Sequence, residues 1–559
     1  MKLPLMWVSV AVTLFAVFPL TDTDIWWHLA CAREWVTTWT PVREPIVNVH
    51  EYFQQTVAFV YNFGGAPLLV AFKAVLWGLV FALFLWPCSR HSSSMLDTWL
   101  RSCQKNFCRD SQPSCHSGAF FFVLLFIFRF QFEIRPVLFS LLFLGIYWNI
   151  LPWLFKELCG GRDSLHSCHG AEPMTERLGH VNEQVHCHDS RLICHSGLRA
   201  GISFSVFVAH VVLAIQFLWC KFQGLYILGP IFAFVILALE WWKRCRAGAV
   251  VACKTFAFQA SFVVLLFAMP FFHREGLNLF LYPFGLLDRL LGMSPSAAVF
   301  ASEIAENRSP ITLLMTGENV LQSTLMVVLC VIGIIAAVRI FKRCNRNAVL
   351  ERSPCAVGFF ALWLLVTAIL ALIAERNFVL FLPVFFAVAF RSIEGIYPDL
   401  AEGFRMIHRA VFHVLPIILI AFLLGLWAKS LMSYDSTMVA YQRVPVAATE
   451  WMKSHPHSGR LFNDDRAGGY LAFMNPSDST YIDGRFILKT AEFFERYLGY
   501  STSPQTFLYD TDSLNIDRVV LPLRYYARWD KLLVTLDSAE NWHVAYRDSL
   551  FVVMDRTGR

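Results

Sequence analysis

Residues 3–29 read LPLMWVSVAVTLFAVFPLTDTDIWWHL, an apolar run followed at once by an acidic turn. A membrane-spanning helix needs roughly 20 mostly apolar residues, and the run from Leu3 to Leu20 approaches that length. Lys2 precedes it, as in a secretory signal, but Thr-Asp-Thr-Asp follows where a small-residue cleavage site would stand. The stretch predicts an uncleaved membrane anchor with two carboxylates at its outer end.

Similar apolar stretches recur as far as residue 428. Hydrophobic residues make up 56% of the 559-residue chain and charged residues only 16%, against roughly 25% charged in a soluble domain. Lipid leaves backbone polar groups no water partner, so such runs form helices. The third stretch is interrupted by Arg129, Glu133 and Arg135. The sequence predicts an α-helical polytopic membrane body at residues 1–429 with about 11 spans, near 3–20, 67–87, 117–134, 137–155, 203–219, 225–241, 255–272, 320–338, 354–374, 378–393 and 411–428.

Residues 430–559 differ in composition, with 30 charged residues in 130, whereas residues 1–429 contain 58 in 429. Short apolar runs bounded by Gly, Pro, Asn or Asp predict strands at 460–463, 469–473, 480–482, 518–522 and 550–554. Helices are expected at 444–453, 490–499 and 529–536. The tail is therefore predicted to be a C-terminal soluble α/β domain.

Two short motifs in this tail predict structural roles rather than binding or catalytic ones. Gly468-Gly469 is too short to cradle a phosphate and predicts a tight turn. Asp483-Gly-Arg485 predicts a turn with a local ion pair, with saccharide binding as the alternative. The domain itself is expected to recognise an acceptor or to cap the membrane cavity.

The positive charges indicate an orientation. If the N-terminus is cytoplasmic, the inner segments hold 22 Lys and Arg residues and the outer loops nine. Positive charge gathers on the cytoplasmic side, so we expect the N-terminus inside and the C-terminal domain outside the cytoplasmic (inner) membrane.

The net charge of +6 is too small and scattered to predict a nucleic-acid partner. Ten of the 15 Cys fall on the inner side, so a disulfide framework is not expected.

Two predicted cytoplasmic inserts, 88–116 and 156–202, are rich in Cys and His. Between Cys159 and His195 lie four Cys and six His, residue types that bind zinc. No Cys-x-x-Cys pair occurs, and similar Asp-Ser…Cys-His units recur in both inserts. We interpret the inserts as solvated low-complexity sequence, with a zinc site in the second as the alternative.

The first outer loop carries the most informative motif, Thr21-Asp-Thr-Asp-Ile-Trp-Trp-His-Leu29. Two carboxylates at the mouth of a membrane cavity, Asp22 and Asp24, suit a divalent cation (Mg or Mn) or a general base. The following Trp pair suits the headgroup zone. The alternative is that the two acids only cap an interfacial helix.

Three outer cations, Arg135, Lys221 and Arg376, are candidates for binding a lipid phosphate. The alternative is snorkelling or ion pairing, for example with Glu375. The loop at 273–319 is expected to form a partial lid whose acids are solvated. Lys73 and His210 are expected to be isolated ionisable residues within the body.

The chain resembles the GT-C class of multi-spanning glycosyltransferases, within a poorly characterised bacterial branch. The residues that carry the resemblance are Asp22-Thr-Asp-Ile-Trp-Trp-His-Leu29, Arg33-Glu-Trp35, Arg135-Pro136, Trp219 to Gly229, Pro283-Phe-Gly285, Arg376, Phe462-Asn463, Gly468-Gly-Tyr-Leu471 and Tyr481-Ile-Asp-Gly-Arg485.

The resemblance implies inverting transfer of a sugar from a polyprenyl-phosphate carrier to an acceptor at the outer face. The class uses an acidic residue of the first outer loop as base or metal ligand, which maps to Asp22 or Asp24. His28, in the same motif, is a further catalytic candidate. The partners implied are a lipid-linked sugar donor, an acceptor of unknown class and membrane lipid.

The chain departs from better-known members at 219–224, where Cys220, Lys221 and Gln223 stand, and it has no Trp-Trp-Asp acceptor motif. A non-catalytic membrane scaffold or partner subunit is therefore the alternative function. A transporter is the third alternative. Transport favours ionisable residues at midplane depth, whereas the acids of this chain cluster at one face.

Overall fold

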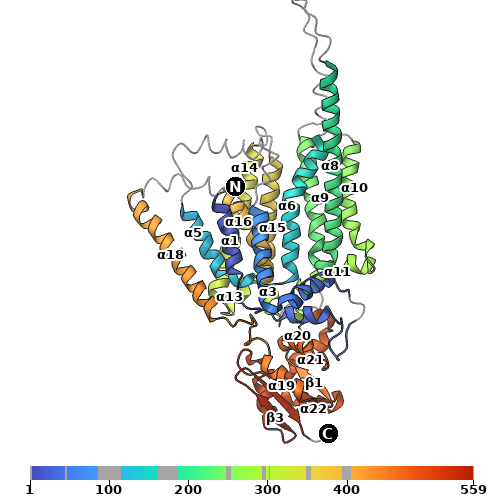
Figure 1. Ribbon diagram of the computed structural model, residues 1–559, viewed down its shortest axis with the longest axis vertical. Coiled ribbons are helices and arrows are strands. Elements are labelled where there is room, and N and C mark those ends of the chain that lie inside the picture. Colours follow the sequence, from blue (N-terminus) through green and yellow to red (C-terminus); the bar gives the residue numbers. More distant parts are fainter. Residues whose placement is uncertain are drawn as a thin grey trace, which may run out of the picture.

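The computed structural model describes residues 3–43, 47–85, 115–160, 187–246, 253–291, 298–300, 303–347, 354–392 and 405–557. The protein is mostly helical, at 72%. Figure 1 shows a body of long helices above a smaller region that contains the sheet and the C-terminus. The predicted inserts and the Cys159–His195 cluster lie largely outside the described residues.

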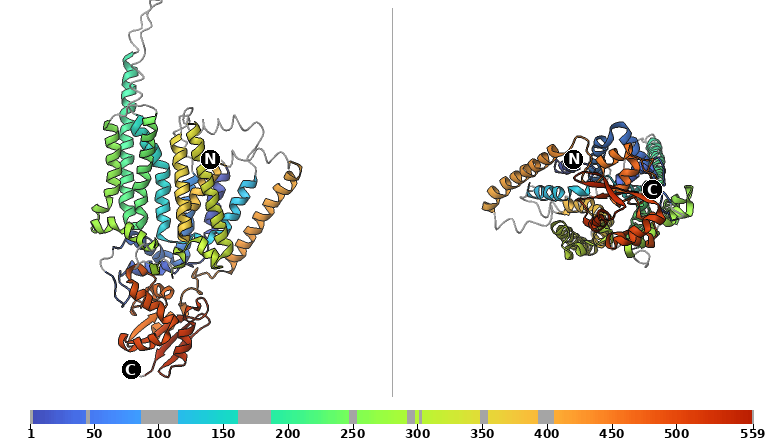
Figure 2. Two further views of the ribbon diagram at one scale, coloured as in Figure 1. Left: turned by 180° about the vertical axis from the view of Figure 1, so that it is seen from behind. Right: turned by 90° about the horizontal axis from the view of Figure 1, so that it is seen from below.

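A helix overlaps each of the predicted apolar stretches. These helices are α1 (Leu3–Phe15), α3 (Glu51–Leu85), α5 (Cys115–Ile127), α6 (Pro136–Gly160), α8 (Cys187–Phe222), α9 (Leu228–Arg246), α10 (Cys253–Ala268), α14 (Val320–Asn347), α15 (Pro354–Ile373), α16 (Phe378–Ser392) and α18 (Arg405–Ser433). Figures 1 and 2 show α18 inclined away from the bundle beside α5.

Five helical segments of the described residues are long and apolar enough to cross a membrane. A sixth is added if α10, continued by η3 (Met269–Phe272), and α11 (Gly276–Leu291) count as one broken span; the two parts are bent by 105° at the break between Phe272 and Gly276. The five are Glu51–Leu85, Pro136–Phe155, Ser205–Phe222, Gly224–Trp242 and Val320–Lys342. The count of eleven spans and the orientation therefore stay predictions.

A kink divides α3 into two parts. Gly64 and Gly65 leave helical geometry, and Gly65 takes a positive φ of 62°, which favours glycine. The apolar stretch predicted from residue 67 is the second part. The first part exposes Phe59 and Phe63 and follows α2 (Asp24–Cys31). Figure 1 shows these blue turns lying across the lower end of the bundle, next to the C-terminal region. We keep the name first outer loop for the segment between α1 and α3, although its side of the membrane stays a prediction.

The C-terminal region is a four-stranded mixed sheet packed with helices. Its strand order is β1 (Arg460–Asn463), β2 (Ile516–Pro522), β4 (Phe551–Arg556) and β3 (Trp542–Arg547), with β1 parallel to β2 and the other pairs antiparallel. The helices are α19 (Val446–Ser454), α20 (Asp465–Met474), α21 (Ala491–Thr502), α22 (Pro504–Leu514) and α23 (Asp530–Asp537). An aromatic core that includes Phe462, Tyr497 and Trp529 joins α21, α22 and α23 to the sheet, and a second cluster that includes Ala448 and Leu471 joins α19 and α20 to it.

The strands predicted at 460–463, 518–522 and 550–554 are confirmed, as are the helices at 444–453, 490–499 and 529–536. The other two strands are wrong. Residues 469–473 belong to α20, and 480–482 contribute only an isolated bridge between Thr480 and Thr38. The sequence patterns predicted neither α22 nor β3.

The tight turn predicted at Gly468-Gly469 is also wrong, because both residues lie inside α20. Their role is close packing. A Cβ on Gly469 would lie 2.8 Å from the backbone nitrogen of Trp27, and one on Gly468 would lie 2.8 Å from Cα of Asp483. Small residues here let α20 approach α2, which brings the C-terminal region onto the first outer loop.

Candidate functional site

The acidic motif of the first outer loop begins α2. Asp22 is buried, with 6% of the residue exposed, and its Oδ1 accepts the backbone N–H of Asp24 at 3.2 Å. The carboxylate thus restrains the first residue of the helix, but the N-cap residue is Thr23 and its side chain makes no capping bond, so Asp22 and Asp24 are not helix caps in the predicted sense. The Asp22 carboxylate also has a second role, because both of its oxygens face Arg135.

Arg135, directly before α6, is bound by two carboxylates. Its Nε donates to Asp22 Oδ2 at 2.7 Å and its Nη2 to Asp22 Oδ1 at 3.1 Å. Its Nη1 and Nη2 donate to the two oxygens of Glu306, each at 2.6 Å. Bidentate arginine–carboxylate pairs are strong and directional, so the guanidinium joins the first outer loop to the loop before α13 (Pro310–Met315).

Glu306 lies in η4 (Ala305–Asn307), within the loop whose acids we expected to be solvated. That expectation is wrong for Glu306, because its carboxylate is paired although 42% of the side chain is exposed. Although partial burial acts to raise it, the pKa of Glu306 falls to about 2 because of Arg135, Arg376 and Arg466. No local sequence signal could have found this pair, which is 171 residues apart.

Arg376 lies in η5 (Glu375–Asn377) and contacts the same loop. Its Nη1 donates to Asn307 Oδ1 at 2.8 Å, and the backbone N–H of Glu375 donates to Arg308 O at 3.0 Å. The segment η4 is therefore held by both predicted phosphate-binding arginines. We call Asp22, Asp24, Arg135, Glu306 and Arg376 the arginine cluster.

Asp24 is the carboxyl of the cluster whose protonation is most perturbed. Burial, followed by the negative charge of Asp22, raises its pKa to about 7, although the charge of Arg135 opposes the shift. The C-terminal region lies close by, since a Cβ on Gly484 would be 3.4 Å from Asp24 Oδ1. A carboxyl with this pKa is present both protonated and ionised near neutral pH.

His28 lies one turn after Asp24 in α2 and packs against other rings. The residue is 2% exposed, and its ring lies edge-on to His50 at 5.4 Å and to Phe53 at 4.7 Å. Burial, together with the charges of His50 and Arg485, lowers the pKa of His28 well below its usual value. The imidazole is therefore neutral at physiological pH and helps to seat α2 against α3.

Lys221 is engaged by other acids. Its Nζ lies 2.9 Å from Glu51 Oε2 and also pairs with Glu275. These contacts agree with the ion-pairing alternative for Lys221. They also place the ammonium among carboxylates other than those that bind Arg135.

Lys73 is not isolated, contrary to expectation. Its Nζ donates to Phe18 O at 3.1 Å and lies 3.9 Å from Oε2 of Glu133, whose other oxygen, Oε1, accepts the hydroxyl of Thr21. The indole of Trp77 donates to Glu133 O at 3.0 Å. This buried set joins α1, α3 and the turn before α6 next to the arginine cluster.

The carboxylate pair does not fit a divalent cation well. Both Asp22 oxygens already accept N–H groups of Arg135, whose positive charge would lie beside the metal. Among the described residues, no group of three His, Cys, Asp or Glu side chains is arranged to hold a metal ion. We therefore derive no chemical step through Mg or Mn at Asp22 and Asp24.

A cleft of about 250 Å³ lies beside α2. Leu29 and Arg33 line it from the first outer loop, Gln55 and Phe59 from the first part of α3, and Phe473 from α20. Arg33 donates to Phe473 O at 3.2 Å. The cleft is therefore amphiphilic and adjoins the exposed aromatic face of α3.

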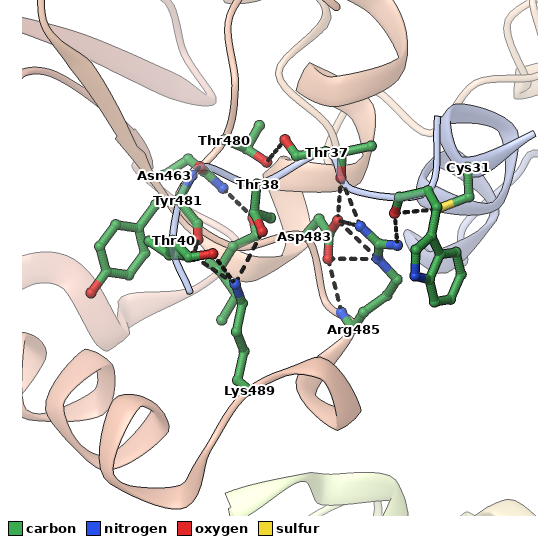
Figure 3. Close-up of polar contacts among 12 residues, drawn as sticks. Cys31, Thr37, Thr38, Thr40, Asn463, Thr480, Tyr481, Asp483, Arg485 and Lys489 are labelled. Atoms are coloured by element: carbon green, nitrogen blue, oxygen red, sulfur yellow. Dashed lines mark hydrogen bonds and ion pairs between the residues drawn. The ribbon is translucent and has the colours of Figure 1, made fainter. Parts of the chain in front are cut away.

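A second set of contacts joins the first outer loop to the C-terminal region, shown in Figure 3. The predicted ion-paired turn is confirmed: Gly484 has a φ of 81°, and Arg485 makes a bidentate pair with Asp483. Arg485 also donates to Trp35 O at 2.6 Å and to Thr37 Oγ1 at 2.8 Å.

Lys489 completes this second set of contacts. Its Nζ donates to Thr38 Oγ1 at 3.0 Å, Thr40 Oγ1 at 2.6 Å, Thr40 O at 3.2 Å and Pro41 O at 3.2 Å, as seen in part in Figure 3. These acceptors are neutral, and burial lowers the pKa of Lys489 to about 8. We call the residues of this contact the loop seam: Thr37, Thr38, Thr40, Asp483, Arg485 and Lys489.

Comparisons with known proteins add no family to this geometry. No protein-family model matches the chain, and no curated protein matches its sequence significantly.

Proposed function

We propose that the chain is an integral membrane glycosyltransferase that moves a sugar from a polyprenyl-phosphate carrier to an acceptor at the outer face of the cytoplasmic membrane. The observation that carries the proposal is the convergence of Asp22 and Asp24 with Arg135, and of Arg376 through the η4 segment, at one end of the helical body. The proposal includes the GT-C-like topology of about eleven spans, with the N-terminus inside and the C-terminal region outside.

Asp24 is the general base in this proposal. A pKa near 7 makes its carboxylate a stronger proton acceptor than an ordinary aspartate, while leaving much of it ionised at neutral pH. Asp22 is the positioning residue, because it orients Arg135 and holds the start of α2. Arg135 and Arg376 bind the phosphate of the donor.

The proposed step is a single displacement with inversion. The acceptor hydroxyl oxygen attacks the anomeric carbon and forms the new glycosidic bond while the bond from that carbon to the phosphate oxygen breaks. The electron pair of the broken bond leaves with the polyprenyl phosphate, and the hydroxyl proton passes to Asp24. The arginines stabilise the negative charge that gathers on the leaving phosphate.

A non-catalytic scaffold or partner subunit is the second candidate function. It is favoured by the pairing of Arg135 with both Asp22 and Glu306, and of Arg376 with Asn307, since such contacts also serve to join segments. Under this interpretation the C-terminal region is an interaction module.

Replacing Asp24 by Asn in the full chain separates the two functions. We expect transfer from lipid-linked donors to fall by about 10²–10⁴-fold, the usual contribution of a general base. Asp22→Asn is expected to lower transfer as well, because it frees one side of Arg135. The assay measures the glycosylated product in reconstituted membranes with each donor.

Glu34→Gln is the matched control, because Glu34 is an exposed acid on the same loop. It is expected to keep the wild-type rate. Undiminished transfer by Asp24→Asn at an equal protein level would refute the assignment of the base. Absence of transfer by the wild-type chain with every donor would leave the scaffold function.

A further inference from the structure

Glu306 lies among three arginines that come from distant parts of the chain. Its two oxygens accept Nη1 and Nη2 of Arg135, each at 2.6 Å. The charges of Arg376, from η5, and Arg466, from α20, also act on it. Asp22 neutralises the other side of Arg135, so Glu306 occupies the remaining N–H groups of Arg135 while the charges of Arg376 and Arg466 act on the same carboxylate.

The segment that carries Glu306 is connected to both parts of the molecule. The adjacent Asn307 accepts Arg376 at 2.8 Å and donates to Phe300 O at 3.0 Å. Phe300 is 3% exposed, and its ring stacks on Phe494 of α21 at 5.1 Å. The segment that carries Glu306 therefore contacts the aromatic core of the C-terminal region.

Arg466 acts on Glu306 from the C-terminal side through its charge. Its guanidinium lies 3.8 Å from the ring centroid of Tyr526, a contact that restrains the side chain. Among the described residues, Arg466 makes no side-chain hydrogen bond. Its N–H donors therefore stay available to a ligand that approaches Glu306.

A guanidinium fork binds carboxylate and phosphate through the same pair of N–H groups. A phosphate brings more negative charge and more acceptor oxygens than a carboxylate, so it makes better use of several arginines. We propose that Glu306 is an internal occupant of an anion site formed by Arg135, Arg376 and Arg466, and that a phosphate group entering this site displaces it.

The choice of phosphate rests on the proposed function, whereas the arrangement of the arginines does not. The phosphate is either free or lipid-linked. Displacement releases η4 from Arg135, and Arg466 then brings the C-terminal region onto the bound phosphate. Until a phosphate competes for the site, Glu306 thereby keeps the N–H groups of Arg135 occupied.

The proposal is tested by binding in the full chain, reconstituted in nanodiscs. The probes are inorganic pyrophosphate and polyprenyl monophosphate. Glu306→Gln is expected to bind at least one probe about tenfold more tightly than the wild type, because the competing charge is gone. Arg466→Gln is expected to weaken that binding about threefold to tenfold. Glu303→Gln, an exposed acid of the same loop, is the matched control and should bind as the wild type does.

A second measurement uses the wild-type chain, so it does not depend on the variants folding. Saturating pyrophosphate or polyprenyl monophosphate should raise amide hydrogen exchange in peptides that cover 303–309, because η4 loses its contact with Arg135. If Glu306→Gln binds only polyprenyl monophosphate more tightly than the wild type does, the ligand is lipid-linked. If it binds both probes more tightly, the site recognises the phosphate group itself.

Unchanged or weaker binding of both probes by Glu306→Gln would overturn the proposal, as would unchanged exchange at 303–309 with bound probe. These readouts contain no sugar transfer. Tighter phosphate binding without any transfer would thus reject the glycosyltransferase function alone, and Asp24-dependent transfer without tightening would reject the role of Glu306 alone.

Discussion

The loop seam and the arginine cluster both tie the first outer loop to distant segments, yet their charged groups are satisfied in different ways. In the loop seam, the side chains of Asp483 and Arg485 are 1% and 2% exposed. In the arginine cluster, Arg135 and Glu306 keep 27% and 42% of their side chains exposed. The first contact is closed to water, and the second is open to exchange with solvent or ligand.

The two contacts also differ in how their cations are held. In the loop seam, Arg485 and Lys489 donate across the contact to Trp35, Thr37, Thr38 and Thr40, and all of these acceptors are neutral. In the arginine cluster, Arg135 is held between the buried Asp22 and the more exposed Glu306. The comparison therefore indicates a structural role for the loop seam, and it supports the ligand exchange proposed for the arginine cluster.

The largest expected effect comes from breaking the buried pair of the loop seam. Arg485→Met leaves the Asp483 carboxylate buried without its partner, which costs about 3–5 kcal/mol of local stability. Hydrogen-exchange mass spectrometry on peptides covering 480–489 and 35–41 measures the loss in the full chain. Lys453→Met removes an exposed pair with Glu450 and should change stability by less than about 1 kcal/mol. Equal effects of the two variants would contradict the structural role of the loop seam.

Lys489→Met is expected to have a smaller effect of the same kind. It leaves neutral oxygens of Thr38, Thr40 and Pro41 without a donor, and it removes a buried charge whose pKa is already lowered to about 8. Loss of hydrogen bonds to neutral acceptors costs about 1–3 kcal/mol. The same exchange experiment measures it, with the exposed Lys531→Met as control. A loss as large as that of Arg485→Met would mean that charge pairing is not what distinguishes Asp483.

The sequence was most informative where a local property decides the structure. The length of each apolar run located the helices, and the turn residues around 483–485 predicted an ion pair that the fold contains. The carboxylates Asp22 and Asp24 were recognised because two acids at the end of an apolar run are conspicuous.

The rest depends on contacts between residues that no local pattern connects. Glu306 joins Arg135 across 171 residues, and Thr37 joins Arg485 across 448. Gly468 and Gly469 predict a turn by residue type, but they lie in α20 because only glycine lets that helix approach Trp27 and Asp483. Tertiary packing overrides local preference at these positions.

The smallest expected effect is a pH dependence that belongs to the arginine cluster alone. The proposed base must be ionised to accept a proton, and burial beside Asp22 raises the pKa of Asp24 to about 7. Transfer at limiting donor should therefore rise about tenfold between pH 6 and pH 8. The rate should level off above the pKa, because the carboxylate is then fully ionised.

Two variants make this rise specific to Asp24. Asp24→Asn should retain only a slow rate that does not rise through pH 7, because an amide does not titrate there, whereas Glu34→Gln should keep the wild-type profile. Arg485→Met, which weakens the loop seam, is expected to lower the amount of folded protein without moving the midpoint of the rise. A midpoint near the usual aspartate pKa of about 4 would instead mean that Asp24 is solvated during the reaction. In that case burial beside Asp22 would not set the protonation of Asp24 during transfer, and the assignment of Asp24 as the base would lose its support.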